Sequence, residues 1–216
     1  MEQSTDNTAT LLTIGVDPAS QQRNWQCTTR WLHGFIAVGI SGQLLLSLVM
    51  ANPHRLQQAS GFGRFALEVH EMLGLATLLF MVAHWVWVML PRSDISFAHL
   101  FPYTPAGLRR VLADMRHLWH ERKLPPISEI GGLSGFIHGL GFLTASVMVS
   151  SGFGLYLALE LGGGVKSSAF HTLGNIHGFF GNLMWAYLTG HVLAAAWHQY
   201  RGEPIITNMF RRNPVQ

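Results

Sequence analysis

The sequence has little cysteine and little charge. Only one cysteine, Cys27, occurs among 216 residues, which excludes an internal disulfide framework, a cysteine-ligated iron–sulfur cluster and a zinc ribbon. No Cys-x-x-Cys-His motif is present that could attach a c-type haem covalently. Charged residues make up 12% of the chain, about half the fraction usual in soluble domains. A lipid bilayer is therefore the expected environment, and any cofactor is expected to be held by histidine.

Histidine is abundant beside so few charges. Twelve histidines accompany fourteen Lys and Arg and eleven Asp and Glu. The formal net charge is only +3 and the arginines are dispersed, so we expect no nucleic-acid partner. The number of histidines therefore needs a functional explanation.

Hydrophobic residues make up 49% of the sequence, and many lie in four long stretches without Asp, Glu, Lys or Arg. The stretches run from Leu32 to Pro53, Met72 to Pro91, Ile130 to Leu159 and Ser167 to Tyr200. Each is long enough for a membrane span, which needs roughly 20 apolar residues to cross about 30 Å of hydrocarbon. A soluble bundle of buried helices is the alternative, but it would have too little charged surface. We therefore predict an all-α integral membrane four-helix bundle, with spans at about 31–53, 70–91, 132–159 and 170–199.

The positive charges favour one side of this bundle. Eleven of the fourteen Lys and Arg lie in the N-terminal segment, the second connection and the C-terminal tail: Arg23, Arg30, Arg92, Arg109, Arg110, Arg116, Arg122, Lys123, Arg201, Arg211 and Arg212. The positive-inside rule then places both termini in the cytoplasm. Residues 1–22 are polar, so we expect a disordered tail without a signal peptide, followed by a membrane domain at 23–210 and a short tail at 211–216.

The connection between the second and third predicted spans has a helical pattern of its own. Thr104 and Pro105 are typical of a helix start, and Pro125 and Pro126 are expected to end it. Apolar residues recur at helical spacing opposite the charged ones: Leu108, Val111, Leu112, Met115, Leu118 and Trp119. We expect this basic amphipathic helix to lie on the anionic cytoplasmic leaflet; the alternative is a docking surface for a soluble partner.

Six histidines fall within or at the ends of the predicted spans: His33, His70, His84, His138, His177 and His191. A polar ring in hydrocarbon costs free energy unless something binds it. The two histidines of the second span are 14 residues apart, as are the two of the fourth, so each pair lies on one helix face, roughly 21 Å apart in depth. Near the cytoplasm, depth pairs His33 with His191. Near the outer surface, it pairs His70 with His177.

Imidazole pairs at two depths are the arrangement that two haems stacked across a membrane require. Glycines at these positions would let a flat porphyrin approach the backbone, although close helix packing predicts the same glycines: Gly34, Gly42, Gly74, Gly139, Gly141, Gly178 and Gly181. A single histidine of this kind is more often only hydrogen-bonded between helices. A di-metal hydroxylase would need dense histidine clusters, and the one close pair is His117 with His120.

Segment Thr29–His33 opens the first span, Val69–Gly74 opens the second, and the stretch from His177 through His191 to His198 forms the fourth. Together these segments resemble the bacterial cytochrome b561 family, which is related to the di-haem cytochrome b subunits of formate dehydrogenases and nickel–iron hydrogenases. The resemblance covers the chain from about Trp25 to Met209. It implies two haem b groups, a multi-pass location in the bacterial inner membrane, and four axial ligands: His33, His70, His177 and His191.

Two residues remain open to more than one interpretation. His84 follows His70 by 14 residues, so it is an alternative ligand in place of His33. Otherwise His84 and His138 are candidates for a proton-linked quinone site near the cytoplasmic haem. Arg30, one turn before His33, is expected to pair with a haem propionate; the alternative is a flanking positive charge.

The resemblance implies electron transfer between the quinone pool and a redox partner, such as a dehydrogenase, a hydrogenase or a soluble cytochrome. The alternative is a stand-alone oxidoreductase that oxidises a small donor such as superoxide, with quinone as acceptor. A non-redox transporter that relays protons through histidine is a third interpretation. The sequence has no evident substrate pocket, which favours the electron-transfer subunit.

Overall fold

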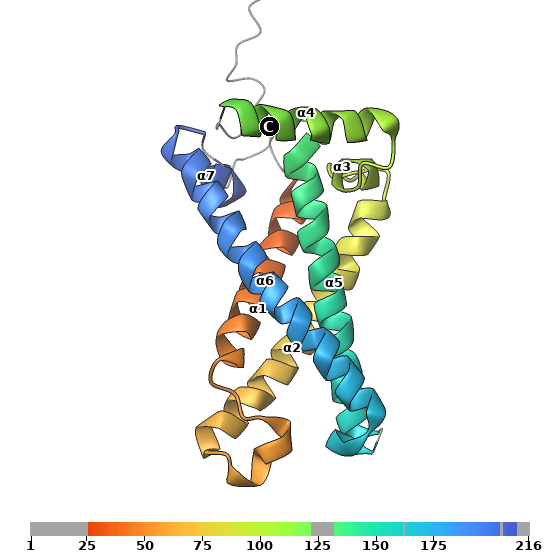
Figure 1. Cartoon of the computed structure of the whole chain (residues 1–216), viewed down its shortest axis with the longest axis vertical. Coiled ribbons are helices and arrows are strands. Elements are labelled where there is room, and N and C mark those ends of the chain that lie inside the picture. The colour runs from red at the N-terminus through yellow and green to blue at the C-terminus, as the bar shows by residue number, and fades with distance from the viewer. Residues whose placement is uncertain (1–25, 122–131, 162, 204, 211–216) are drawn as a thin grey trace, which may run out of the picture.

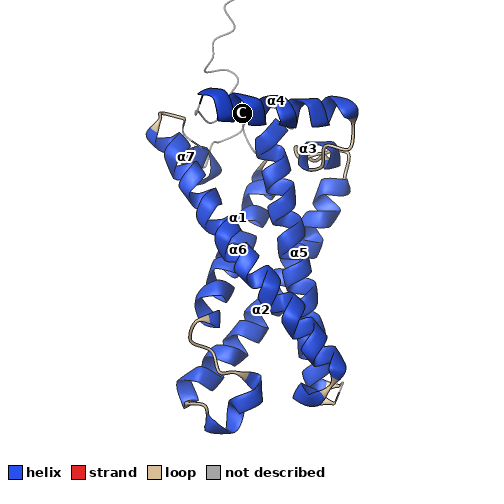
Figure 2. Cartoon of the chain, viewed as in Figure 1, coloured by secondary structure: helices blue, strands red, loops and turns tan. Residues whose placement is uncertain are grey.

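All the regular secondary structure in the described residues is helical, without a strand (Figure 2). The computed structural model describes residues 26–121, 132–161, 163–203 and 205–210. Its four long helices are α1 (Cys27–Ser47), α2 (Gly61–Met89), α5 (Gly132–Glu160) and α6 (Ser168–Tyr200). The predicted tails at 1–22 and 211–216 lie outside these ranges, as do Pro125 and Pro126.

The short elements gather at the two ends of the long helices. They are η2 (Pro53–Gln58), α3 (Phe97–Leu100), α4 (Pro105–Glu121), η3 (Gly164–Lys166) and α7 (Ile205–Phe210). Figure 1 shows α3, α4 and α7 at one end, here named the α4 end. The opposite end, here named the η2 end, carries the α1–α2 and α5–α6 connections. The long helices therefore alternate in direction, and α1 begins at the same end where α6 finishes.

The helix ends follow local capping more than the apolar stretches. Helix α1 ends at Ser47, whereas the predicted span continues to residue 53. At residue 53 a new helix, η2, has already begun, because Asn52 Oδ1 caps it by accepting a hydrogen bond from the His54 amide. Helix α2 begins at Gly61 rather than near residue 70, because Ser60 Oγ caps it by accepting a bond from the Gly63 amide at 3.1 Å. Helices α5 and α6 lie within two residues of the predicted spans.

Two of the long helices, α2 and α5, are long and apolar enough to cross a membrane by length and composition. In the described part of the chain, α1 and α6 do not reach the same hydropathy. Both carry polar side chains along their length, including Gln43 on α1 and Asn182 on α6. The four-span topology therefore stays a prediction.

The core of the bundle is one apolar layer to which each long helix contributes a side chain. These are Leu44, Met81, Ala145 and Met184, all almost fully buried. Close backbone packing joins α1 to α2, α5 to α6 and α2 to α5, whereas the described part of α6 makes at most slight contact of this kind with α1 and α2. The bundle therefore consists of two tight hairpins joined through α2 and α5.

Glycines on α5 let the short helix α3 lie directly against it. A Cβ on Gly139 would overlap the carbonyl oxygen of Leu100, and a Cβ on Gly135 would approach that of His99. Backbone atoms cannot rotate away as the end of a flexible side chain can. Glycine is therefore required at these two positions for α3 to pack where it does.

Replacing Gly139 with alanine should destabilise the protein by about 1–3 kcal/mol, because the new methyl group must displace the α3 backbone. The matched control is Gly174→Ala on α6, where the nearest atom, on Leu155, lies 4.0 Å from the added Cβ. That change should be neutral or stabilise by up to about 1 kcal/mol. Thermal unfolding in detergent, followed by circular dichroism, measures both. Equal midpoints for the two variants would contradict this packing.

Candidate functional site

Two pairs of histidines meet across the bundle, and α6 contributes one ring to each. At the α4 end, the ring centroids of His33 on α1 and His191 are 6.3 Å apart, with 50° between the planes. At the η2 end, those of His70 on α2 and His177 are also 6.3 Å apart, with 83° between the planes. The structure thus brings together the pairs that the depth argument predicts.

The spacing within each pair suits one metal ion between the two rings. A metal–imidazole bond is about 2 Å long and a ring nitrogen lies about 1.2 Å from its centroid, so rings on opposite sides of one ion have centroids about 6 Å apart. Among the described residues, no group of three or more His, Cys, Asp or Glu side chains is arranged to hold a metal ion. Each histidine pair therefore offers two ligands on its own, and the other ligands would have to come from a prosthetic group.

The apolar core layer lies between the two pairs. Met184 is seven residues from His177 and seven from His191 along α6, and it packs in this layer with Leu44 and Met81. The two histidine pairs are thus separate sites with packed, apolar protein between them. This part of the bundle is expected to have a low dielectric constant.

The helices that carry each pair leave space beside it. Neither α1 nor α2 packs closely on the described part of α6. A Cβ built on Gly34, next to His33, or on Gly178, next to His177, would meet nothing within 4 Å. The other glycines that the sequence analysis associates with the histidines differ from these two. A Cβ would press against a side chain or the backbone at Gly42, Gly74, Gly139 and Gly141. At Gly181 it would make ordinary van der Waals contact. Only Gly34 and Gly178 therefore fit the approach of a flat ring.

Buried ring nitrogens at these sites lack partners within the described chain. The Nδ1 atoms of His33, His70 and His84 are buried and make no hydrogen bond there. An unsatisfied buried polar atom costs about 1–3 kcal/mol. The centroid spacing of the two pairs and the donor chemistry of imidazole fit a bound haem.

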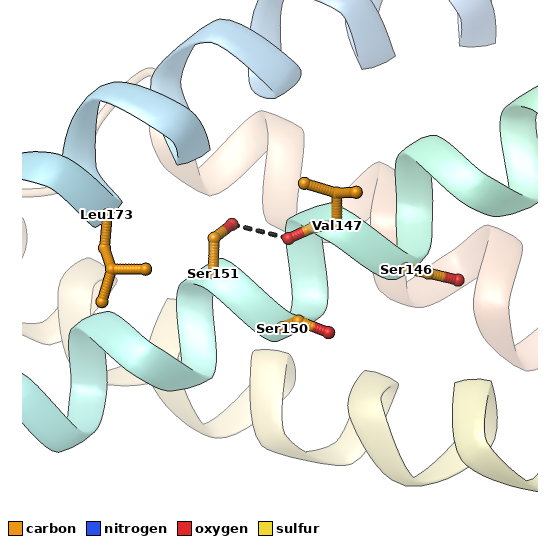
Figure 3. Close-up of a pocket in the computed structure, with 5 residues that line it drawn as sticks. All are labelled: Ser146, Val147, Ser150, Ser151 and Leu173. Atoms are coloured by element: carbon orange, nitrogen blue, oxygen red, sulfur yellow. Dashed lines mark hydrogen bonds between the residues drawn. The ribbon is translucent and has the colours of Figure 1, made fainter.

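Ser151 on α5 orients His177. Its Oγ donates to the carbonyl oxygen of Val147 at 2.7 Å (Figure 3) and lies 3.1 Å from His177 Nδ1. With its proton directed to a backbone carbonyl, the Ser151 oxygen is able to accept from His177 Nδ1–H, and this tautomer of His177 leaves Nε2 with its lone pair available. Beside Ser151, an open cleft of about 340 Å³ is lined by Ser146, Val147, Ser150, Ser151 and Leu173 (Figure 3).

Two side chains enclose the ring of His191. Tyr187 stacks on it with centroids 5.6 Å apart and 14° between the planes. The ring of His138 meets it edge-on at 5.1 Å, while His138 Nδ1 bonds to the Ser134 carbonyl oxygen at 2.7 Å. The Tyr187 ring occupies the space that a Cβ on Gly141 would fill. Gly141 therefore serves the site indirectly, by making room for Tyr187.

His84 lies near the same end but does not meet the ring of His191. It is 7% exposed and its ring contacts Phe142, with centroids 4.8 Å apart. It is close enough to His33 to interact with it electrostatically, as are His138 and His191. Four histidines thus gather at the α4 end, of which His33 and His191 form the pair.

Arg30 lies one turn before His33 and links α1 to α7. Its Nε donates to the carbonyl oxygen of Met209 at 2.8 Å. The guanidinium is therefore held at the α4 end, next to the His33–His191 pair.

Sequence reasoning missed the two residues that hold the α6 histidines, Ser151 and Tyr187. Ser151 carried a signal, because a hydroxyl in an apolar span usually has a hydrogen-bond partner. Tyr187 carried none, since an aromatic residue in a span is ordinary. The structure also stacks the exposed rings of His54 and His171 at 5.5 Å at the η2 end, a contact that the sequence did not indicate.

Comparison with known proteins gives one match. The model of the family described as prokaryotic cytochrome b561 matches residues 24–212. No curated protein and no solved structure shows significant similarity to the chain. Proteins of the matched family are membrane-integral b-type cytochromes that bind haem b and transfer electrons. Because the match spans nearly the whole chain, including every histidine of the two pairs, the protein belongs to the prokaryotic cytochrome b561 family.

Proposed function

We propose that this cytochrome binds two b haems, one between His33 and His191 and one between His70 and His177. The observation that carries the proposal is the pair of cross-helix histidine contacts, each with centroids 6.3 Å apart. The open space at Gly34 and Gly178 supports it further. His84 remains outside the ligand set in this proposal because its ring lies against Phe142.

We propose that the protein transfers electrons between the quinone pool and a redox partner. When bound, each haem supplies a centre for reversible one-electron transfer. The chain fixes the imidazoles: Ser151 orients His177, and Tyr187 with His138 encloses His191. The core layer keeps water from the space between the two sites and, by burial, tunes their potentials.

The proposed topology has four spans in the bacterial inner membrane, with both termini and the α4 end in the cytoplasm. The excess of Lys and Arg in the terminal segments and the second connection supports this orientation. It places the His33–His191 site toward the cytoplasm and the His70–His177 site toward the outer surface. Arg30 is then held by Met209 beside the cytoplasmic site, where we propose that its guanidinium pairs with a haem propionate.

We propose His84 and His138 as the proton-handling groups of a quinone site near the cytoplasmic haem. Quinone reduction takes up protons as well as electrons, so it needs titratable groups beside the electron-transfer centre. His138 contacts His191 directly, and His84 interacts with His33. Neither is needed as a ligand, and the buried Nδ1 of His84 has no partner within the described chain.

The ligand assignment predicts which variants lose which haem. His33→Ala and His191→Ala should each lose one haem and keep the other, whereas His70→Ala and His177→Ala should lose the second and keep the first. Removing one imidazole of a pair would leave a single histidine to hold the haem at that site. Haem stoichiometry and the reduced-minus-oxidised spectrum of the purified variants measure the result.

His84→Ala is the control for this assignment, because it removes a buried histidine of the same span as His70. It should keep both haems. Loss of a haem in His84→Ala, together with full occupancy in His33→Ala, would show that α2 rather than α1 supplies the fourth ligand.

The quinone site predicts an effect on turnover without an effect on haem content. His84→Ala and His138→Ala should each slow quinone reduction by at least about tenfold, since positioned proton transfer usually contributes more than that. His120→Ala, an exposed histidine on α4, is the matched control and should react at the rate of the unmodified protein. Unchanged rates in the first two variants, with both haems present, would refute the site.

Ser151→Ala should weaken the His70–His177 site alone. Without the Ser151 oxygen, the His177 ring loses one of its hydrogen-bond partners, and such losses typically reduce metal affinity about 10- to 100-fold. The rate of haem loss and the midpoint potential of that site are the measurements. Ser150→Ala, on the exposed neighbouring position of α5, should change neither. Equal behaviour of the two variants would show that the Ser151 bond does not hold the ligand.

A further inference from the structure

Helix α4 exposes an apolar stripe that no described part of the chain covers. Leu108, Leu112, Met115 and Trp119 are 52%, 55%, 51% and 83% exposed. At ~100° per residue, these four positions fall within about 60° of one another around the helix. They therefore form one continuous apolar face along nearly the full length of α4, named here the α4 stripe.

A different face of α4 fixes it to the bundle. Val111 is almost fully buried, and Asp114 Oδ2 accepts a bond from the amide of Leu133 at the start of α5, at 2.8 Å. The helix is thus held in a defined orientation, and packing on α5 does not use the stripe. A helix that rolled freely could bury its apolar residues against the bundle, but this one is prevented from doing so.

Cationic side chains border the stripe. Arg109 and Arg116 are exposed, and helical geometry places both roughly 80° from its centre, on the same side. His120 lies on that side as well. One face of α4 is therefore apolar, and the adjoining face is basic, as in helices that lie in the plane of a membrane surface.

The position of α4 places this stripe at the level of the membrane surface. Figure 1 shows α4 lying across the end of the long helices, where α2 finishes and α5 begins. Those two helices are the ones apolar enough to cross a bilayer. In α5 the side chains of Ile137 and Leu140, within the first turns, are large, apolar and exposed. The stripe and these exposed apolar side chains of α5 therefore lie at the same end of the bundle.

We infer that α4 is an interfacial helix whose stripe inserts among phospholipids while Arg109 and Arg116 bind anionic headgroup phosphates. Guanidinium groups pair with phosphate oxygens, and tryptophan prefers the boundary between headgroups and acyl chains. The helix then fixes the depth of the α4 end, including the His33–His191 site beneath it. This inference rests on membrane insertion of α2 and α5 and not on the haem ligands proposed above.

Spin labels can test the inference on the full-length cytochrome in vesicles. Cys27 is the only cysteine, so a Cys27→Ser background accepts one label at a chosen site. Met115→Cys places the label in the stripe, and Ala113→Cys places the control label on the basic side of the same helix, two residues away. Collision with oxygen, which concentrates in lipid, is compared with collision with a water-soluble nickel complex. The haem spectrum of each variant confirms that it has folded.

In vesicles of phosphatidylcholine and phosphatidylglycerol, the oxygen-to-nickel ratio should be several-fold higher at position 115 than at position 113. In phosphatidylcholine alone, or after Arg109→Gln with Arg116→Gln, the label at 115 should become more accessible to nickel. Equal ratios at the two positions would overturn the inference and leave the stripe to a soluble partner. Dipolar broadening between labels at 115 would also overturn it, because the stripe would then be covered by a second copy of the chain.

Discussion

The structure depends on one constraint: α6 must present two imidazoles, 14 residues apart, to two different partner helices. His191 meets α1 and His177 meets α2, while α6 itself packs tightly on α5. A helix in close backbone contact with its partner leaves no room for a planar group between them. Among the four long helices, the tight contacts lie within the two hairpins and between α2 and α5, and the histidine pairs lie across the interfaces that stay open. Histidine rings meet in both of these interfaces, on either side of the core layer where Met184 packs with Leu44 and Met81.

Tight packing elsewhere supports these open interfaces. Gly42 and Gly74 bring α1 and α2 together through Leu73 and Gln43, and Gln43 Nε2 also donates to the carbonyl oxygen of His70 at 3.0 Å. On the other hairpin, Gly141 admits Tyr187 to the space beside His191. Gly42, Gly74 and Gly141 thus allow the close packing that positions the histidines. Gly34 and Gly178, which are adjacent to histidines in sequence, instead leave open space beside them. This division explains why glycine alone is a weak signal for a cofactor site: one residue type serves two opposite purposes.

The histidine pairs could be predicted from the sequence, because the spacing of histidines along a helix determines which of them share a face. Fourteen residues correspond to nearly whole helical turns, so His177 and His191 had to share a face whatever the details of packing. The alternation of span direction then paired each with a histidine of the same depth. Ser151 and Tyr187 could not be predicted, since their roles depend on how α5 is rotated against α6, which periodicity does not determine. The helix ends could not be predicted from the uncharged stretches for a related reason. The Ser60 hydroxyl caps α2, so this helix begins at Gly61, before the uncharged stretch that starts at Met72.

The two histidine pairs differ in the side chains that surround them. At the η2 end, the Ser151 hydroxyl contacts His177 Nδ1 and donates its own proton to the Val147 carbonyl oxygen. Ser151 therefore orients the ring but is not a titratable group. At the α4 end, His191 is accompanied by His138, and His84 is buried nearby with an unpartnered nitrogen. An imidazole nitrogen is able to take up or release a proton when an electron arrives, which a serine hydroxyl does not do. Within the described residues, extra imidazoles therefore accompany the His33–His191 pair, and this difference between the two pairs supports the proposal that quinone chemistry takes place at the α4 end.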